Sequence, residues 1–249
     1  MQRYFLEEAY TPKELYQVSG EPYHHMVRVM RMTPEARVYL AFNDQLSIVA
    51  EITEISETTV FLKEIEKEQQ EKELPVAITI ASGYPKGDKL ELIVQKGTEL
   101  GAAGFIGFPA KTSVVKWDAK KLAKKQQRLA KIAQEAAEQS HRQVTPTVEL
   151  LTSEKEFLQQ AAVFDVIVIA YEESAKQGET AQLAKILQNI EPGSRLLAVF
   201  GPEGGFTAAE IDAFTAINGQ LCGLGPRILR AETAPFYLLS AASYQLELA

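Results

Sequence analysis

The chain has 249 residues and a net charge of -7, with 46% hydrophobic and 24% charged residues, which is typical of a soluble globular protein of one large or two smaller domains. The acidic balance argues against a general nucleic-acid coat, and the single cysteine, Cys222, excludes an intramolecular disulfide and a thiolate zinc cluster. The acidic N-terminal segment MQRYFLEEAY is unlike a signal peptide, and no apolar run reaches the roughly 18 residues of a membrane span, so we expect a cytoplasmic protein.

Residues 1–73 are rich in short β-branched and aromatic runs. RVYLAFN, SIVAEITEI and TVFLKEI are separated by acidic and turn residues, which predicts a small barrel or meander. Before them, EPYHHMVRVMRM predicts a short helix or turn with arginines three residues apart. The charged segment Glu66–Pro75 predicts a linker between this domain and a second domain, residues 74–249.

From Val76 onward, strands alternate with helices. The predicted strands are VAITIA, FIGF, DVIVIAY, RLLAVF and QLCGLG, and the predicted helices begin near Asp88, Ala119, Thr180, Thr207 and Pro235. Capping-box patterns, Asp88 with Glu91 and Thr207 with Glu210, mark two of these helix starts. The alternation predicts an α/β domain with a mostly parallel sheet and helices on both faces.

The segment GPEGGF, residues 201–206, joins an apolar strand to a capped helix. It is neither GxGxxG nor a P-loop, because its glycines stand at Gly201, Gly204 and Gly205 and no Gly-Lys-Ser/Thr follows. Glu203 occupies the place that an anionic phosphate would need at a helix N-terminus, so the loop suits a neutral or cationic flat ligand better. A tight turn with a solvated Glu203 explains the segment equally well.

The segment LGPRILRAETAP, which begins at Leu224, is a second strand end followed by a turn and a helix start. Two such loops at the carboxyl ends of parallel strands would converge on one crevice, where open α/β sheets bind ligands. Arg227 and Arg230 would add positive charge to that crevice. Alternatively, Arg230 forms an ion pair with Glu232 or Glu203.

The segment from Lys111 to Lys131 is strongly basic. Its cations are Lys111, Lys116, Lys120, Lys121, Lys124, Lys125, Arg128 and Lys131, against one acid, Asp118. Leu122, Leu129, Ile132 and Ala136 form its apolar stripe, so most of the lysines face outward. A solvated helix face is the usual explanation of a charge run, but the single sign favours contact with phosphates. His24, His25 and His141 form no metal pattern with neighbouring acids, and we expect no metal ion.

Five motifs occur together and in order: KGDKLELIVQKGTELG, SVVK, IAQEAAEQSHR, GPEGGF and LGPRILRAETA. In this combination the full-length chain resembles the ribosomal RNA small subunit methyltransferase E family. The resemblance implies an N-terminal PUA-like β-barrel and a C-terminal SPOUT-type α/β domain with a trefoil knot, an exception to the rule against threaded chains. It also implies a homodimer that transfers a methyl group from S-adenosylmethionine to N3 of one uridine in the 16S ribosomal RNA of the small subunit.

The resemblance places the cofactor in the two glycine-containing loops. The implied cofactor residues are Val199, Phe200, Gly201, Glu203, Gly204, Gly205, Leu224, Gly225, Ile228, Leu229 and Arg230. S-adenosylmethionine carries a sulfonium cation and no phosphate, which agrees with the chemistry expected of GPEGGF. Uridine N3 carries a proton and lies on the Watson–Crick edge, so the target base must be unpaired or extruded. We expect Arg230 to stabilise negative charge on a uracil oxygen, and Glu232 or Glu203 to accept the proton.

The resemblance also makes RNA the partner of the basic residues. The predicted RNA-binding residues are Arg28, Arg31, Lys116, Lys120, Lys121, Lys124 and Lys125. One alternative is a related knotted methyltransferase that acts on transfer RNA or on a ribose hydroxyl. Another is a non-catalytic RNA-binding assembly factor that has kept the fold.

Overall fold

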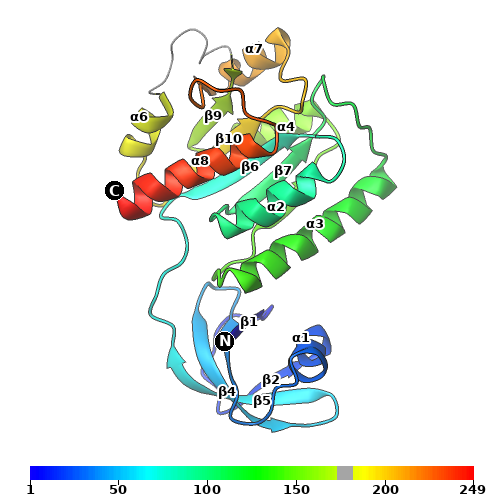
Figure 1. The fold of residues 1–249 in the computed structure, drawn as a ribbon, viewed down its shortest axis with the longest axis vertical. Coiled ribbons are helices and arrows are strands. Elements are labelled where there is room, and N and C mark those ends of the chain that lie inside the picture. Colours follow the sequence, from blue (N-terminus) through cyan, green and yellow to red (C-terminus); the bar gives the residue numbers. More distant parts are fainter. Residues whose placement is uncertain (173–181) are drawn as a thin grey trace. The chain divides into compact units, whose positions relative to one another are not determined.

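The computed structural model describes residues 1–172 and 182–249 (Figure 1). The chain forms two compact units, residues 1–73 with 137–145, and residues 74–136 with 146–249. The sequence had assigned 137–145 to the second domain. In the structure, the Glu73 carboxylate accepts hydrogen bonds from the side chain of buried Arg142 and from the backbone amides of Gln143 and Val144. These bonds tie the segment to the end of the first unit.

The first unit is a five-stranded, curled sheet in the order β1-β3-β4-β5-β2. Its strands are β1 (Gln2–Phe5), β2 (Tyr16–Ser19), β3 (Arg37–Ala41), β4 (Ser47–Ile55) and β5 (Thr59–Lys67). β1 pairs with β3 in parallel and the other neighbours are antiparallel. The β4–β5 pairing shifts register after Val49 and again after Ile52, and such bulges increase the local twist of a strand pair. The predicted small barrel or meander is therefore confirmed as a curled sheet.

A helical segment follows β2. α1 (Gly20–His24) continues directly into a π-helical turn, η1 (His25–Val29). Tyr23 and Met26 pack into the core of the first unit, whereas Arg28 and Arg31 are exposed. Arg31 has a φ of 52°, a left-handed conformation that cannot continue a right-handed helix. The segment thus presents two predicted RNA-binding arginines at its end.

The second unit contains a six-stranded sheet in the order β11-β9-β10-β6-β7-β8, with every neighbouring pair parallel. The strands are β6 (Ala77–Gly83), β7 (Gly104–Phe108), β8 (Thr147–Leu150), β9 (Val166–Ala170), β10 (Arg195–Phe200) and β11 (Gln220–Cys222). The described helices that begin in this unit are α2 (Lys89–Glu99), α3 (Ala119–Gln139), α4 (Glu154–Ala161), α6 (Gln182–Asn189), α7 (Ala208–Ala216), α8 (Thr233–Ser243) and η2 (Tyr244–Leu248). The prediction of a mostly parallel sheet is confirmed.

The two faces of this sheet form separate cores because side chains alternate along each strand. Leu196, Ala198 and Phe200 of β10 pack with residues of α2, α3, α6 and α8. Leu197 and Val199 of the same strand pack with residues of α4 and α7. Figure 1 shows α2 and α8 side by side over the sheet, in agreement with their mutual contacts. Helices therefore cover both faces, as predicted, and none of the described helices is both long and apolar enough to cross a membrane.

The first predicted capping box does not form. Asp88 stands at the N-cap of α2, but its side chain accepts no hydrogen bond there. Glu91 lies instead 2.7 Å from Arg128 of α3, so a tertiary ion pair replaces the local bond.

Asp118, the single acid of the basic segment, has a local role, because it accepts a hydrogen bond from the amide of Lys121 at the start of α3.

The trefoil knot depends on the path of the chain between β9 and α6. Residues 173–181, which include the predicted helix start at Thr180, lie outside the described residues. The knot therefore stays a prediction.

The second capping box is confirmed, and its glutamate is fully buried. The Glu210 carboxylate accepts hydrogen bonds from the amide and hydroxyl of Thr207, at 2.8 and 2.7 Å, and from the amide of Lys111 at 2.8 Å. Both carboxylate oxygens thus face donors, and a glutamine would turn an NH2 group towards one of them. We expect Glu210→Gln to lower the free energy of unfolding by about 2 kcal/mol, measured by urea denaturation.

The exposed Asp212, in the same helix, provides the control. Asp212→Asn should change the free energy of unfolding by less than about 0.5 kcal/mol. Equal stability of the two variants would show that the buried carboxylate does not fasten α7.

Candidate functional site

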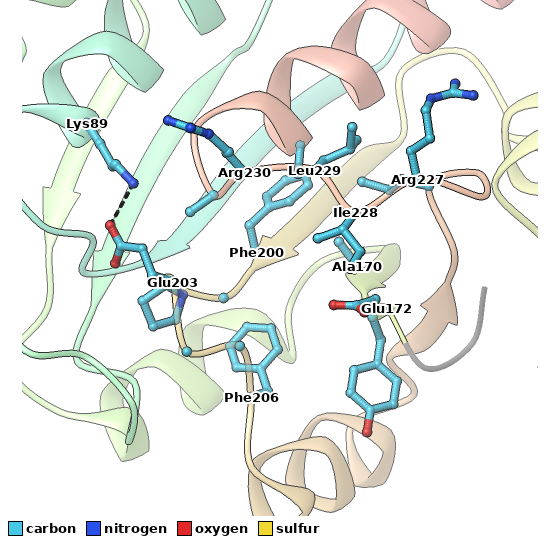
Figure 2. Close-up of a pocket in the computed structure, with 18 of the residues that line it drawn as sticks. Lys89, Ala170, Glu172, Phe200, Glu203, Phe206, Arg227, Ile228, Leu229 and Arg230 are labelled. Atoms are coloured by element: carbon cyan, nitrogen blue, oxygen red, sulfur yellow. Dashed lines mark ion pairs between the residues drawn. The ribbon is translucent and has the colours of Figure 1, made fainter. Parts of the chain in front are cut away.

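A cleft of about 700 Å³ lies at the carboxyl ends of β9 and β10. Its size falls within the roughly 300–1,000 Å³ of small-molecule sites. Residues 170–172, 200–206, 224–225 and 227–231 line it, together with Lys89 of α2 and Ala234 of α8. Figure 2 shows these segments around one hollow. The two loops singled out in the sequence therefore do meet, at the edge where parallel sheets bind ligands.

All the predicted cofactor residues except Val199 line this cleft. Val199 is 1% exposed and packs in the core on the α4 and α7 side, because strand alternation turns it away from the neighbouring Phe200. Glu232 does not line the cleft. Its carboxylate lies 3.1 Å from the ammonium of Lys89, and Lys89 does line the cleft.

The GPEGGF loop is a narrow turn. The amide of Gly205 donates to the carbonyl of Pro202 at 2.9 Å. A Cβ atom on Gly201 would lie 3.0 Å from the Cα of Gly205, and one on Gly204 would lie 2.8 Å from the Cβ of Thr112. The Thr112 hydroxyl also donates to the Gly205 carbonyl at 2.6 Å. A side chain at 201 or 204 would therefore force Gly205 or Thr112 to move, so the glycines allow the turn to be this narrow.

The second loop offers backbone groups to the cleft. Gly225 has a φ of 84°, and the carbonyl of Arg230 accepts the amides of Thr233 and Ala234 at the start of α8. Between these points, and within the described part of the chain, the amides of Ile228 and Leu229 donate to no other protein group. Because both residues line the cleft, their amides are available to hydrogen-bond a ligand.

Lys89, in the first turn of α2, was missed by the sequence analysis. Its ammonium lies 2.8 Å from Glu203 and 3.1 Å from Glu232. The amide of Lys86 donates to the same Glu203 carboxylate at 3.2 Å. The alternative in which Glu203 pairs with Arg230 is therefore wrong, since Lys89 holds that carboxylate. A usable signal existed, because Lys89 follows a predicted strand end and so belongs to the ligand-binding edge of the sheet.

The two glutamates of the site are held in their charged form. Burial raises the pKa of Glu203, but its hydrogen bonds with Lys89 and with backbone amides lower it by more, so its pKa lies below the ordinary value. The pKa of Glu232 is lowered in the same way, with burial again opposing, through backbone bonds, Lys89 and the charge of Arg230. The ion pairs with Glu203 and Glu232 raise the pKa of Lys89. A carboxylate with a lowered pKa is a weak base, which counts against either glutamate as the proton acceptor.

Among the residues that the structure describes, the cleft has three further charged side chains, and those of Arg230 and Arg227 point in different directions. In Figure 2 the guanidinium of Arg230 lies on the side of Lys89, whereas the side chain of Arg227 points away from the hollow. Glu172, at the end of β9, also lines the cleft but was not singled out in the sequence. Its strand was predicted correctly, and only the pairing of β9 with β10 shows that its end belongs to the site.

Only some of the predicted RNA-binding lysines in the basic segment 111–131 have exposed side chains. Lys116, Lys120, Lys121 and Lys124 are exposed, and the apolar stripe of α3 is buried or half-buried beneath them. Lys125 differs, because its ammonium lies over the Trp117 ring, 4.9 Å from the centroid. Other cations of the segment pair within the protein: Lys111 with Glu154 and Arg128 with Glu91.

Comparisons with known proteins agree with this architecture. The family model described as RNA methyltransferase domain matches residues 72–243, and the one described as RNA methyltransferase PUA domain matches residues 18–65. The ribosomal RNA small subunit methyltransferase E of Bacillus subtilis is 49% identical over 251 residues, covering 100% of this chain and 98% of that protein. The protein of the same name from Synechocystis is 32% identical, covering 80% of this chain and 62% of that protein.

Solved structures show the same fold. A crystal structure of a hypothetical protein is 46% identical, with a TM-score of 0.90 and 99% of each chain covered. A Legionella pneumophila protein described as a methyltransferase, in complex with the cofactor SAM, is 27% identical, with a TM-score of 0.81 and 97% and 96% of the chains covered. These likenesses confirm the predicted fold class, a PUA-like N-terminal domain followed by a SPOUT-type α/β domain.

Proposed function

The chain belongs to the ribosomal RNA small subunit methyltransferase E family, and from this we propose that it transfers a methyl group from S-adenosylmethionine to N3 of one uridine in 16S ribosomal RNA. The observation that carries the proposal is the meeting of loops 201–206 and 224–231 on one cleft. The proposal includes a homodimer acting in the cytoplasm on the small ribosomal subunit, without a metal ion. Methylation of small subunits that lack the modification tests it.

The cleft fits S-adenosylmethionine in three respects. The narrow turn at Gly201 and Gly204 lets backbone atoms lie against a flat adenine. The amides of Ile228 and Leu229 can hydrogen-bond the edge of that ring. The carboxylates of Glu172 and Glu203 line the cleft and can lie near a cationic sulfur. When bound, S-adenosylmethionine supplies the methyl group.

The protein's part in the reaction is positioning and charge stabilisation. Holding uridine N3 in line with the methyl donor removes much of the barrier to a displacement reaction. N3 becomes a good nucleophile only when its proton leaves and negative charge spreads to the uracil oxygens. We assign the stabilisation of that charge to Arg230, which lines the cleft. Glu232, whose pKa is lowered, acts by pairing with Lys89, and the proton leaves to water.

A homodimer is supported by exposed apolar side chains at the C-terminus. Tyr237, Tyr244 and Leu248 are 40%, 65% and 76% exposed along α8 and η2. Tyr237 and Tyr244 are seven residues apart, which places them on one helix face. Exposed aromatic and aliphatic groups that share a face are typical of protein interfaces.

The lysines of α3 are proposed to hold the RNA. We expect the double reversal Lys120→Glu with Lys124→Glu to weaken binding of 16S ribosomal RNA, because both side chains are exposed on the basic face. The slope of log K against log salt should also become shallower by roughly one to two, since each lost phosphate contact contributes about 0.7–0.9. A filter-binding titration at several salt concentrations measures both effects.

A matched double variant separates local contact from net charge. Lys155→Glu with Lys185→Glu changes the total charge equally at exposed positions on α4 and α6. It should leave the salt slope unchanged. If both double variants lose the same affinity, only overall charge matters and the assignment of the α3 surface fails.

A further inference from the structure

Lys89 connects three segments of the second unit. It stands in the first turn of α2, Glu203 stands in the turn after β10, and Glu232 is the N-cap residue of α8. The single ammonium of Lys89 reaches both carboxylates, at 2.8 and 3.1 Å. Figure 2 shows the Lys89–Glu203 pair at one side of the cleft. One side chain of α2 thus contacts both loops that form the candidate cofactor site.

The other polar contacts of each loop hold that loop separately. Thr112 fastens the carbonyl of Gly205, and the Thr207–Glu210 capping box fastens the exit of the same turn. Within the described residues, no hydrogen bond or ion pair joins 201–206 directly to 224–232. Among the described residues, Lys89 is therefore a polar link between these two walls of the cleft.

The burial and charge of this cluster make the link effective. The side chains of Lys89, Glu203 and Glu232 are 29%, 30% and 16% exposed, so their charges are partly shielded from water and interact more strongly than fully exposed ones. Both carboxylates lie beside the same ammonium, so removing that cation would leave two like charges facing each other. The two loops would then repel where they are now held together.

We propose that Lys89 is a positioning residue that clamps the glycine turn 201–206 to the loop 224–232 and so sets the width of the cofactor cleft. This inference rests on the proposed function, because it takes S-adenosylmethionine as the ligand. In this proposal Lys89 acts through the two loops that it joins and not by chemistry on the substrate. Its loss should therefore lower the population of the binding-competent cleft more than it slows the methyl transfer itself.

Three variants test the clamp by calorimetric titration with S-adenosylmethionine. Lys89→Met removes the ammonium but keeps an unbranched side chain, and it should raise the Kd about tenfold if the competent cleft falls to roughly a tenth of the molecules. Lys89→Arg keeps the charge and should stay within about threefold of the wild type. Lys86→Met is the matched control, because only the backbone amide of Lys86 contacts Glu203 and its side chain is exposed.

Kinetics distinguish positioning from general loss of structure. For Lys89→Met, the KM for S-adenosylmethionine should rise with the Kd, while kcat at saturating cofactor stays within about threefold of the wild type. Adding Glu232→Gln to Lys89→Met should be less than additive in binding, since the two side chains act as one unit.

The possible failures are separable. If the wild-type chain binds S-adenosylmethionine and Lys89→Met binds it with the same Kd, the clamp alone is overturned. The clamp is also overturned if Lys86→Met loses as much affinity as Lys89→Met. A wild-type chain that binds no S-adenosylmethionine overturns the proposed function, and the clamp with it.

Discussion

Replacing Arg230 by alanine is expected to lower the rate of methyl transfer by about 10²–10³-fold, the usual effect of removing one donor that stabilises an anionic transition state. Arg230 lines the cleft, and in the view of Figure 2 its guanidinium points to the side where Lys89 lies. Since the role assigned to it concerns the uracil and not the cofactor, the Kd for S-adenosylmethionine should change by no more than about threefold. Single-turnover rates at saturating cofactor measure the first effect, and calorimetry measures the second.

Arg227 supplies the control from the same loop. It carries the same charge and lines the same cleft, but its side chain points away from the hollow in Figure 2. Arg227→Ala should therefore retain most of the rate. Normal turnover of Arg230→Ala, with a normal Kd, would remove Arg230 from the mechanism.

Replacing Gly201 by valine is expected to weaken binding of S-adenosylmethionine by about 10- to 100-fold, because overpacking of this kind costs roughly 1–3 kcal/mol. A Cβ atom at Gly201 would lie 3.0 and 3.1 Å from the Cα and carbonyl carbon of Gly205. These are backbone atoms of the same narrow turn, and they can move only if the turn opens. An open turn would no longer bring its backbone close to a flat ligand, and equilibrium titration would detect the loss.

Gly193, between α6 and β10, serves as the control for this experiment. It has a φ of 83° and open space where a Cβ atom would stand. Gly193→Val should destabilise the fold by roughly 1–3 kcal/mol through backbone strain and leave the Kd unchanged. If Gly201→Val bound the cofactor like the wild type, the glycine turn would not be a wall of the pocket.

Features that depend on neighbouring residues could be read from the sequence. The parallel sheet followed from alternating strands and helices, and the start of α7 followed from the Thr207–Glu210 pattern, because a capping box needs only residues three apart. The short strands β1, β2 and β8 were missed, since four residues show too little periodicity to separate a strand from a loop.

Features that depend on distant residues could not be predicted in this way. Asp88 was expected to cap α2, but no such bond forms and Glu91 pairs with Arg128 of another helix. Residues 137–145 were assigned to the second domain, although Glu73 ties them to the first unit. Local patterns contain no information on such tertiary partners.

In the candidate site, too, local features could be predicted from the sequence and contacts between distant residues could not. Its two loops carry recognisable glycines and arginines, and the strand-end rule brought them to one edge of the sheet. One alternative paired Glu203 with Arg230, yet the partner of Glu203 is Lys89, which comes from the helix α2 between β6 and β7. Ion pairs between elements are determined by packing, so only the folded structure could identify this one.

The most direct test of the account is methylation of purified small ribosomal subunits that lack the modification, with S-adenosylmethionine as donor and digestion of the RNA to nucleosides for mass spectrometry. The account predicts 3-methyluridine in the 16S ribosomal RNA, formed by the wild-type chain and strongly reduced with Arg230→Ala. A ribose-methylated nucleoside, or modification of transfer RNA alone, would favour a related methyltransferase activity. No methylated product from an active preparation of subunits would contradict the central claim.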